Sequence, residues 1–146
     1  MPKTVEKTKG VAFTIDEIKI LDKSLSKPPI KSLDKSDFEY DVSLEISTDV
    51  KEKKNTHTIV VSIRSKADQS DLGTLAVLCV FNIFNISDFI VESKAKIALR
   101  SDVNDLLNSI SIGTTRGILY SEFRGTFLEK AILPILDIKK FHVAED

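Results

Sequence analysis

The chain is poor in the residues that carry most protein chemistry. Its 146 residues include one Cys, two His and no Trp. The single Cys79 excludes a disulfide framework, and its apolar surroundings in the sequence are typical of an inert buried thiol. His57 and His142 are far apart, with no cysteine near either, so neither a metal site nor a His-based triad is expected. We therefore expect no metal and no enzyme activity.

Glycine and net charge are also scarce. The five glycines form neither Gly-x-Gly-x-x-Gly nor Gly-x-x-x-x-Gly-Lys, so the usual phosphate cradles are absent and no cofactor is expected. Because 21 basic residues nearly balance 22 acidic ones, no broad field favours nucleic acid or an anionic membrane. The longest apolar run, near Leu75 to Phe81, is too short to cross a bilayer, and the first residues lack the apolar core of a signal peptide. We expect a soluble cytoplasmic protein.

The length suits one domain with a sizeable core. Residues 1–10 are polar and charged, which predicts a disordered tail, and residues 11–143 are predicted to form the single domain.

Alternation of apolar and polar residues predicts four antiparallel strands. Phe13 and Ile15 alternate, then Ile18 and Ile20 alternate out of phase, which predicts a bulge near Asp16–Glu17 that keeps both pairs on the buried face. Two short strands would fit nearly as well. The other three strands are predicted over 40–47, 59–63 and 74–86.

The fourth predicted strand differs from the others because Leu75 to Phe81 is apolar at every position. A strand of this composition has both faces covered. Helices of the same protomer cover one face, so the other is expected to meet a second subunit or a client. The irregular stretch from Lys23 to Asp37, with Pro28-Pro29, is too long for a tight hairpin.

Helical spacing of apolar residues between Ser101 and Phe127 predicts a long helix, with Ser101 and Asp102 as N-caps. Gly113 and Gly117 either mark a close helix–helix approach or produce a kink or a break. A short second helix is predicted after Phe127 from the apolar positions Leu128, Ile132, Ile135, Leu136 and Phe141, broken near Pro134. The state of the connector 87–100 stays open. The predicted fold class is α+β: a four-stranded antiparallel sheet, a long C-terminal helix and a short second helix.

The C-terminal third carries a family resemblance. Its long helix leads into Arg124-Gly-Thr-Phe127, and Ile132-Leu133-Pro134-Ile135 follows. This order resembles the SecB family of export chaperones, whose long helix ends in Arg-Gly-Thr-Phe before a short apolar segment with Leu and Pro. Phe13–Ile18 is similar to the family's opening strand, and Leu78-Cys79 with Ile83–Ile86 to its last strand. The similarity runs from about Val11 to Phe141.

The resemblance implies an ATP-independent holdase that binds unfolded or extended client polypeptides in an apolar groove. The alternative it offers is a dedicated chaperone of a toxin–antitoxin system that holds an antitoxin. An enzyme and a purely structural oligomer are weaker alternatives. Carried onto this sequence, the client-binding residues are Ile30, Leu33, Phe38, Tyr40, Val42, Leu44, Leu133 and Ile135. For Val42, Leu44 and Leu133, a plain core role is equally expected.

The resemblance also implies a homo-oligomer, either a dimer or a dimer of dimers, with the long helices at the interface. The implied interface residues are Ile110, Gly113, Thr114, Gly117 and Ile118. The family presents acidic and polar residues to the export ATPase SecA, whereas this chain has Val77-Leu78-Cys79-Val80-Phe81 there and ends in only Ala144-Glu145-Asp146. Weak or no binding to a SecA-type ATPase is therefore expected.

Overall fold

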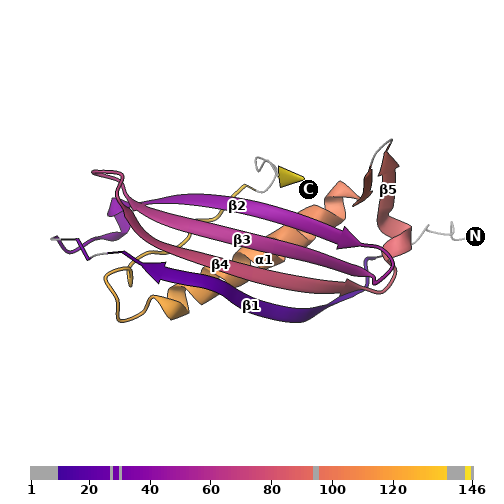
Figure 1. Ribbon diagram of the computed structural model, residues 1–146, viewed down its shortest axis with the longest axis horizontal. Helices are drawn as coiled ribbons and strands as arrows, with labels where there is room; N and C mark the ends of the chain where they lie inside the picture. Colours follow the sequence, from indigo (N-terminus) through magenta and orange to yellow (C-terminus); the bar gives the residue numbers. More distant parts are fainter. Residues whose placement is uncertain (1–9, 27, 30, 94–95, 138–143, 146) are drawn as a thin grey trace, which may run out of the picture.

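The computed structural model describes residues 10–26, 28–29, 31–93, 96–137 and 144–145. Four long strands, β1 (Phe13–Leu25), β2 (Phe38–Asp49), β3 (Lys54–Ser65) and β4 (Asp71–Ile83), form an antiparallel sheet with helix α1 (Ser101–Glu122) across one face (Figure 1). A two-residue strand, β7 (Ala144–Glu145), adds to β2, so the strand order is β1-β4-β3-β2-β7. The predicted α+β fold, with its four-stranded sheet and long helix, is confirmed.

The two faces of the sheet differ in chemistry. On β3, the side chains of Ile59, Val61 and Ile63 have no exposed surface, and the residues between them are half-buried on the opposite face. On β2, the outer face is polar, and the Asp41 carboxylate lies 3.0 Å from the Arg64 guanidinium of β3. The alternation of apolar and polar residues predicts a strand over 40–47, and β2 confirms it. The buried face of β3 packs against α1.

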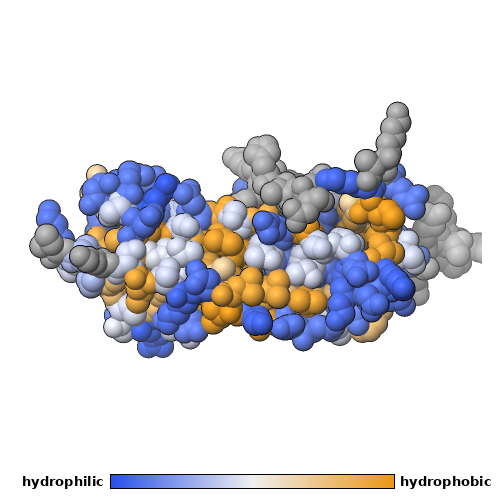
Figure 2. All heavy atoms as spheres, in the orientation of Figure 1, coloured by the Kyte–Doolittle hydropathy of each residue, from blue (hydrophilic) through white to orange (hydrophobic). Residues whose placement is uncertain are grey.

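The outer face of β4 carries apolar side chains that α1 does not reach. Leu75, Val77 and Phe81 are fully buried on the α1 side, while Leu78 and Val80 alternate with them and are half-buried on the other side. Figure 2 shows that side, where apolar residues gather across the middle of the molecule between hydrophilic ones. The described part of the chain does not cover this face, so its predicted cover by another chain stays a prediction.

Strand β1 contains the predicted bulge. The register against β4 shifts between Ile15 and Glu17, and again between Ile20 and Asp22. The first shift places Ile15, Ile18 and Ile20 on one face, opposite Phe81, Cys79 and Val77 of β4. The prediction that this face is buried was wrong for the single chain, because the three isoleucines are 44%, 48% and 37% exposed. The reason is that α1 packs mainly on β3 and β4, leaving β1 beyond its width.

Helix α1 is continuous from Ser101 to Glu122, so a kink or break at Gly113 or Gly117 is not found. Its N-cap is Arg100 rather than the predicted Ser101 or Asp102, and the Arg100 guanidinium binds the Asp102 carboxylate at 2.6 Å. The helix ends before the predicted Phe127. No helix in the described residues is long and apolar enough to cross a membrane.

The predicted second helix is absent from the described residues that follow α1. Residues 123–130 form turns and residues 131–137 have no helix or strand, while Phe141 lies outside the described residues. Arg116 of α1 provides the physical reason, because its guanidinium donates to the carbonyls of Leu133 at 2.8 Å and Pro134 at 2.9 Å. These carbonyls bind α1 instead of amides of their own segment, and Pro134 has no N–H to give.

Two glycines make this turn region possible. Gly125 has a φ of +78°, the left-handed conformation expected just past a helix end. At Gly73 of β4, an added Cβ would lie 2.6 Å from the Leu128 side chain, so the absence of a side chain lets Leu128 pack onto the sheet. Leu128 and Ala131 thereby close the end of the core.

The connector between β4 and α1, which the sequence left open, is a short 3₁₀ helix followed by a hairpin. The 3₁₀ helix η2 spans Ile86–Phe89, and the hairpin consists of β5 (Ile90–Ser93) and β6 (Lys96–Leu99). A second 3₁₀ helix, η1 (Lys35–Asp37), precedes β2. Strand β6 lies next to β2, near the start of α1.

Candidate functional site

Residues 131–137 run beside α1 on the helix-facing side of the sheet, toward β2 (Figure 1). Burial raises the pKa of the Tyr40 hydroxyl on β2, and a hydrogen bond with the backbone of Ile132 acts in the opposite direction. Together with the bonds from Arg116, this contact fixes the segment between α1 and β2. The segment therefore forms the lip of the sheet–helix sandwich at the β2 edge.

The predicted client-binding residues lie at three depths. Phe38, Leu44 and Leu133 are buried in the core, with 6%, 1% and 1% of their surface exposed. Leu33, Tyr40 and Val42 are half-buried and pack against the same apolar cluster. Ile135 is 91% exposed. Ile30 lies outside the described residues.

The structure thus brings most of these residues together around one lip, with only part of the set accessible. On β2 and on residues 131–137, the accessible side chains are those of Tyr40, Val42, Ile135 and also Ile132, which is 42% exposed. We call these four residues the lip surface. The sequence indicated Ile132 only as part of the predicted second helix and of the family motif, and it gave no prediction for Arg116. The available signal was an arginine placed between otherwise apolar or small residues of the long helix.

Of the predicted interface residues, only Gly113 and Gly117 lie on the side of α1 that faces away from the sheet, because Ile110 and Ile118 pack against the core. The fully or nearly buried residues of the helix include Val103, Leu107 and Leu119, whereas Gly113 and Gly117 are exposed and Ile110, Thr114 and Ile118 are half-buried. An added Cβ at Gly117 would meet no described atom within 4 Å. Nothing within the described chain therefore requires glycine there. With Leu106 and Tyr120, the two glycines form a stripe along one side of the helix.

A buried polar cluster joins α1 to the sheet, and sequence reasoning did not find it. His57 of β3 is fully buried, and its Nδ1 lies 2.7 Å from Oδ1 of Asn108 on α1, while its Nε2 contacts Oδ1 of Asn55. Asn55 in turn donates to the Thr48 hydroxyl at 2.8 Å. Burial lowers the pKa of His57 to about 4, although the hydrogen bond with Asn108 acts to raise it. The imidazole is therefore neutral near pH 7.

The remaining candidates for chemistry are the thiol of Cys79 and groups of side chains that could hold a metal ion. Burial raises the pKa of the Cys79 thiol, so the reactive thiolate is disfavoured. Within the part of the chain that the structure describes, no three His, Cys, Asp or Glu side chains are grouped so that they could hold a metal ion.

Comparison with known proteins identifies the architecture. No protein-family profile and no curated protein matches the sequence. Among solved structures, the chain is similar to the Mycobacterium tuberculosis Rv1957 SecB-like chaperone, in complex with a ChAD peptide from the Rv1956 HigA1 antitoxin. The TM-score is 0.55 over 86% of this chain and 90% of that chain, at 14% sequence identity. The chain has a SecB-like fold. At this identity the likeness covers the arrangement of strands and helix, so the roles of single residues depend on the geometry described above.

Proposed function

We propose that the protein is an ATP-independent holdase that binds unfolded or extended polypeptides at the lip surface. The observation that carries this proposal is the exposure of Ile132 and Ile135, at 42% and 91%, beside half-buried Tyr40 and Val42. Apolar side chains that gather at the rim of a domain are typical of interaction sites.

The buried members of the predicted set have a different place in this proposal. Phe38 and Leu44 lie under the lip, and Leu133 is the buried residue of the lip segment itself, so a client reaches these three only if residues 131–137 move away from β2. Leu33 and Ile30 remain proposed contacts from the loop that precedes β2. We assign first contact to the lip surface and deeper contact to the buried residues.

The proposal includes a homo-oligomer, a dimer or a dimer of dimers. Two apolar areas lie uncovered on the α1 side of the described chain: the isoleucines of β1 and the stripe on α1 that contains Gly113 and Gly117. Isoleucine side chains that are more than a third exposed are unfavourable in water, and a second copy would bury them.

A second candidate function is a chaperone dedicated to one antitoxin. The observation that favours it is that the solved structure similar to this chain holds a peptide from an antitoxin. The two candidates share the lip surface and differ in selectivity. A general holdase binds many unfolded chains with similar affinity, whereas a dedicated chaperone prefers one partner by tenfold or more, a difference of about 1.4 kcal/mol.

Hand-off to a SecA-type ATPase is not part of the proposal. The sequence predicts Val77 and Phe81 on the docking face, but both side chains face α1 and are fully buried, so they cannot contact a partner there. The residues of that stretch on the outer face are Leu78 and Val80. Both side chains are uncharged, so they offer no electrostatic attraction to a partner. We place the protein in the cytoplasm, where unfolded clients are made, without a nucleic-acid partner.

The test is suppression of aggregation by the purified protein, without ATP, at a stoichiometric ratio to a chemically unfolded test protein. We expect the wild-type chain to delay light scattering, and Ile135→Asp to lose most of this effect. Phe84→Asp is the matched control, since Phe84 is 52% exposed but lies away from the lip, at the end of β4. Absence of any delay by the wild-type chain would refute the holdase. Equal loss in both variants would refute the lip surface.

A further inference from the structure

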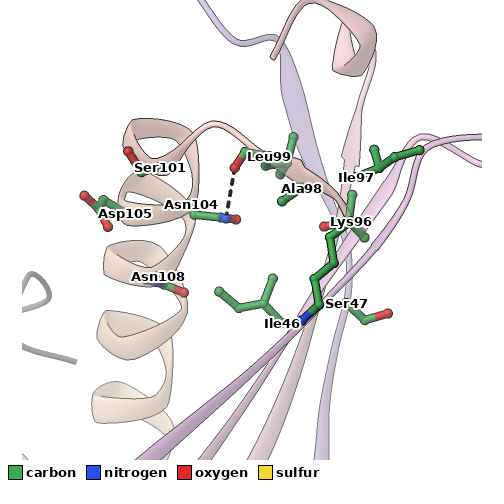
Figure 3. Close-up of a pocket in the computed structure, with 11 residues that line it drawn as sticks. Ile46, Ser47, Lys96, Ile97, Ala98, Leu99, Ser101, Asn104, Asp105 and Asn108 are labelled. Carbon is green, nitrogen blue, oxygen red and sulfur yellow. Dashed lines mark hydrogen bonds between the residues drawn. The ribbon is translucent and has the colours of Figure 1, made fainter. Parts of the chain in front are cut away.

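A cavity separate from the lip surface lies at the C-terminal end of β2, whereas the lip surface lies near the start of that strand. The end of β2, strand β6 and the first turns of α1 line a cavity of about 410 Å³ that is open to solvent on one side. Its apolar wall consists of Ile46, Ile97, Ala98 and Leu99. Figure 3 shows Asn104 projecting from α1 across this space toward β6 and β2. None of these residues belongs to the lip surface.

The cavity has an unused hydrogen-bond acceptor. Oδ1 of Asn104 is buried and accepts no hydrogen bond from the described residues, while its Nδ2 donates to the Leu99 carbonyl at 3.4 Å. That donated bond orients the amide and leaves the oxygen without a donor. A buried acceptor without a partner is unfavourable, so an occupant that brings a donor gains affinity. Tyrosine and tryptophan side chains combine an apolar body with one donor at the tip, which fits this wall and this acceptor.

The edge of β2 beside the cavity already accepts an extended chain. Strand β7 pairs parallel with β2, with Ala144 opposite Glu45 and Glu145 opposite Ile46. Ile46 lines the cavity, and so do the next two residues of β2, Ser47 and Thr48. An extended chain that follows the direction of β7 along β2 therefore passes the mouth of the cavity. The backbone of β2 supplies affinity in this mode, and the cavity supplies side-chain preference.

We propose that this cavity binds a tyrosine or tryptophan side chain of a client segment that adds to β2 as a parallel strand and displaces β7. The inference rests on the proposed holdase function, and it adds a side-chain preference and a competitor. Strand β7 occupies the same edge positions in the absence of a client. The apparent affinity for a client is therefore reduced in proportion to the fraction of molecules in which this edge of β2 is free.

The test uses two fluorescent, soluble, Thr-rich peptides that are identical except for one central Tyr or Phe. The wild-type chain should bind the Tyr peptide roughly fivefold more tightly, the gain from one hydrogen bond to a buried acceptor. Asn104→Leu should reduce this ratio to about one, because the acceptor is lost while the wall stays apolar. Deleting residues 144–146 should tighten binding of both peptides at least roughly twofold, as expected for an edge that β7 occupies half the time.

Two further variants separate the cavity from general surface effects. Ile97→Asp changes a cavity residue that is 56% exposed, so it should weaken binding of both peptides without unfolding the chain. Leu21→Asp changes a residue on β1, at the opposite edge of the sheet, that is 48% exposed, and it should alter neither affinity. Thermal unfolding confirms that Asn104→Leu and Ile97→Asp are folded.

The outcomes distinguish this inference from the proposed function. Suppressed aggregation together with equal affinity for the Tyr and Phe peptides overturns the cavity and leaves the holdase intact. An unchanged Tyr preference in Asn104→Leu, or weaker binding after the deletion, also overturns it. If the wild-type chain binds neither the peptides nor unfolded protein, the holdase itself is wrong.

Discussion

Strands β1 and β4 are neighbours with the same apolar pattern on the same face, yet they differ fully in burial. Phe81 of β4 has no exposed surface, while its register partner Ile15 on β1 is 44% exposed. The same holds one pair along, where Cys79 is 1% and Ile18 is 48% exposed. Both strands carry apolar side chains on this face, but only β4 lies under α1.

This difference teaches that alternation of apolar and polar residues predicts an apolar face that should be buried. It does not reveal whether the same chain or another chain buries that face. On β4 the cover is the chain's own helix. On β1 the corresponding side chains stay exposed in the described chain, and we propose that a second copy covers them together with the exposed stripe on α1, which lies on the same side of the sheet.

The largest effect is expected for truncation in the covered region. Phe81→Ala should cost about 3–5 kcal/mol of unfolding free energy, because the large cavity cannot close around a rigid sheet. Ile15→Ala should change the stability of the isolated subunit by about 0.5 kcal/mol or less, yet weaken association. Urea unfolding at low protein concentration and light scattering at high concentration measure the two effects. Similar destabilisation of the monomer by both variants would contradict the comparison.

The next largest effect is a pH dependence of stability, which arises from His57 on the buried face of β3. Its pKa in the folded chain is about 4, below the ordinary value of 6.5, so the unfolded chain binds more protons between these values. Stability is therefore complete above pH 6.5 and is lost as pH falls toward 4, by at most about 3 kcal/mol. Urea midpoints measured from pH 7.5 to 4.5 should fall steeply in the wild-type chain.

The matched variant is His57→Gln, which keeps a polar side chain and removes the titration. It should lower stability at pH 7.5 and flatten the decline toward pH 4.5, while the carboxylates titrate equally in both chains. An identical pH slope in the two chains would show that His57 does not control the decline.

A smaller effect is expected where α1 holds the lip. Arg116→Met removes both hydrogen bonds to the carbonyls of Leu133 and Pro134, and should cost about 1.5–3 kcal/mol. Amide hydrogen exchange in residues 131–137 should accelerate while β3 and β4 stay protected. Arg124→Met is the control, since Arg124 is exposed and lies 5.8 Å from the Tyr120 ring, and its loss should cost about 0.5 kcal/mol or less. Unchanged exchange in 131–137 would argue against the anchoring role.

The smallest effect on stability is expected on the uncovered side of α1. Gly117→Leu should stabilise the isolated subunit by up to about 1 kcal/mol, since leucine is the better helix former and meets no described atom there. The same change should weaken association, because a bulky side chain stands where the helices are proposed to approach. Mass measured by light scattering decides the point. An unchanged oligomer would contradict helix-mediated packing.

The sequence predicted best what local patterns determine. Strand β2 followed from the alternation between Tyr40 and Ser47, and the bulge in β1 from the phase change at Asp16. The second helix was predicted from the spacing of Leu128, Ile132 and Ile135, and it failed because Arg116 takes the carbonyls that a helix would use. That competition comes from a residue more than ten positions away, so spacing alone does not reveal it.

The candidate site was partly predictable for the same reason. The family resemblance pointed to β2 and the segment around Pro134, and these do meet at the lip. Which of their residues are accessible depended on packing, which buries Leu44 and exposes Ile135. The cluster of His57 with Asn108 joins residues 51 positions apart, and the cavity depends on a hairpin whose structure the sequence left open.

The central claim is that clients bind along the lip and the edge of β2. Hydrogen–deuterium exchange of the chain with and without a chemically unfolded client tests it most directly, because it locates contact without any substitution. The account predicts slower exchange in residues 131–137 and along β2, with little change at the outer-face residues of β4. Protection on β4 alone, or none while aggregation is still suppressed, would contradict it.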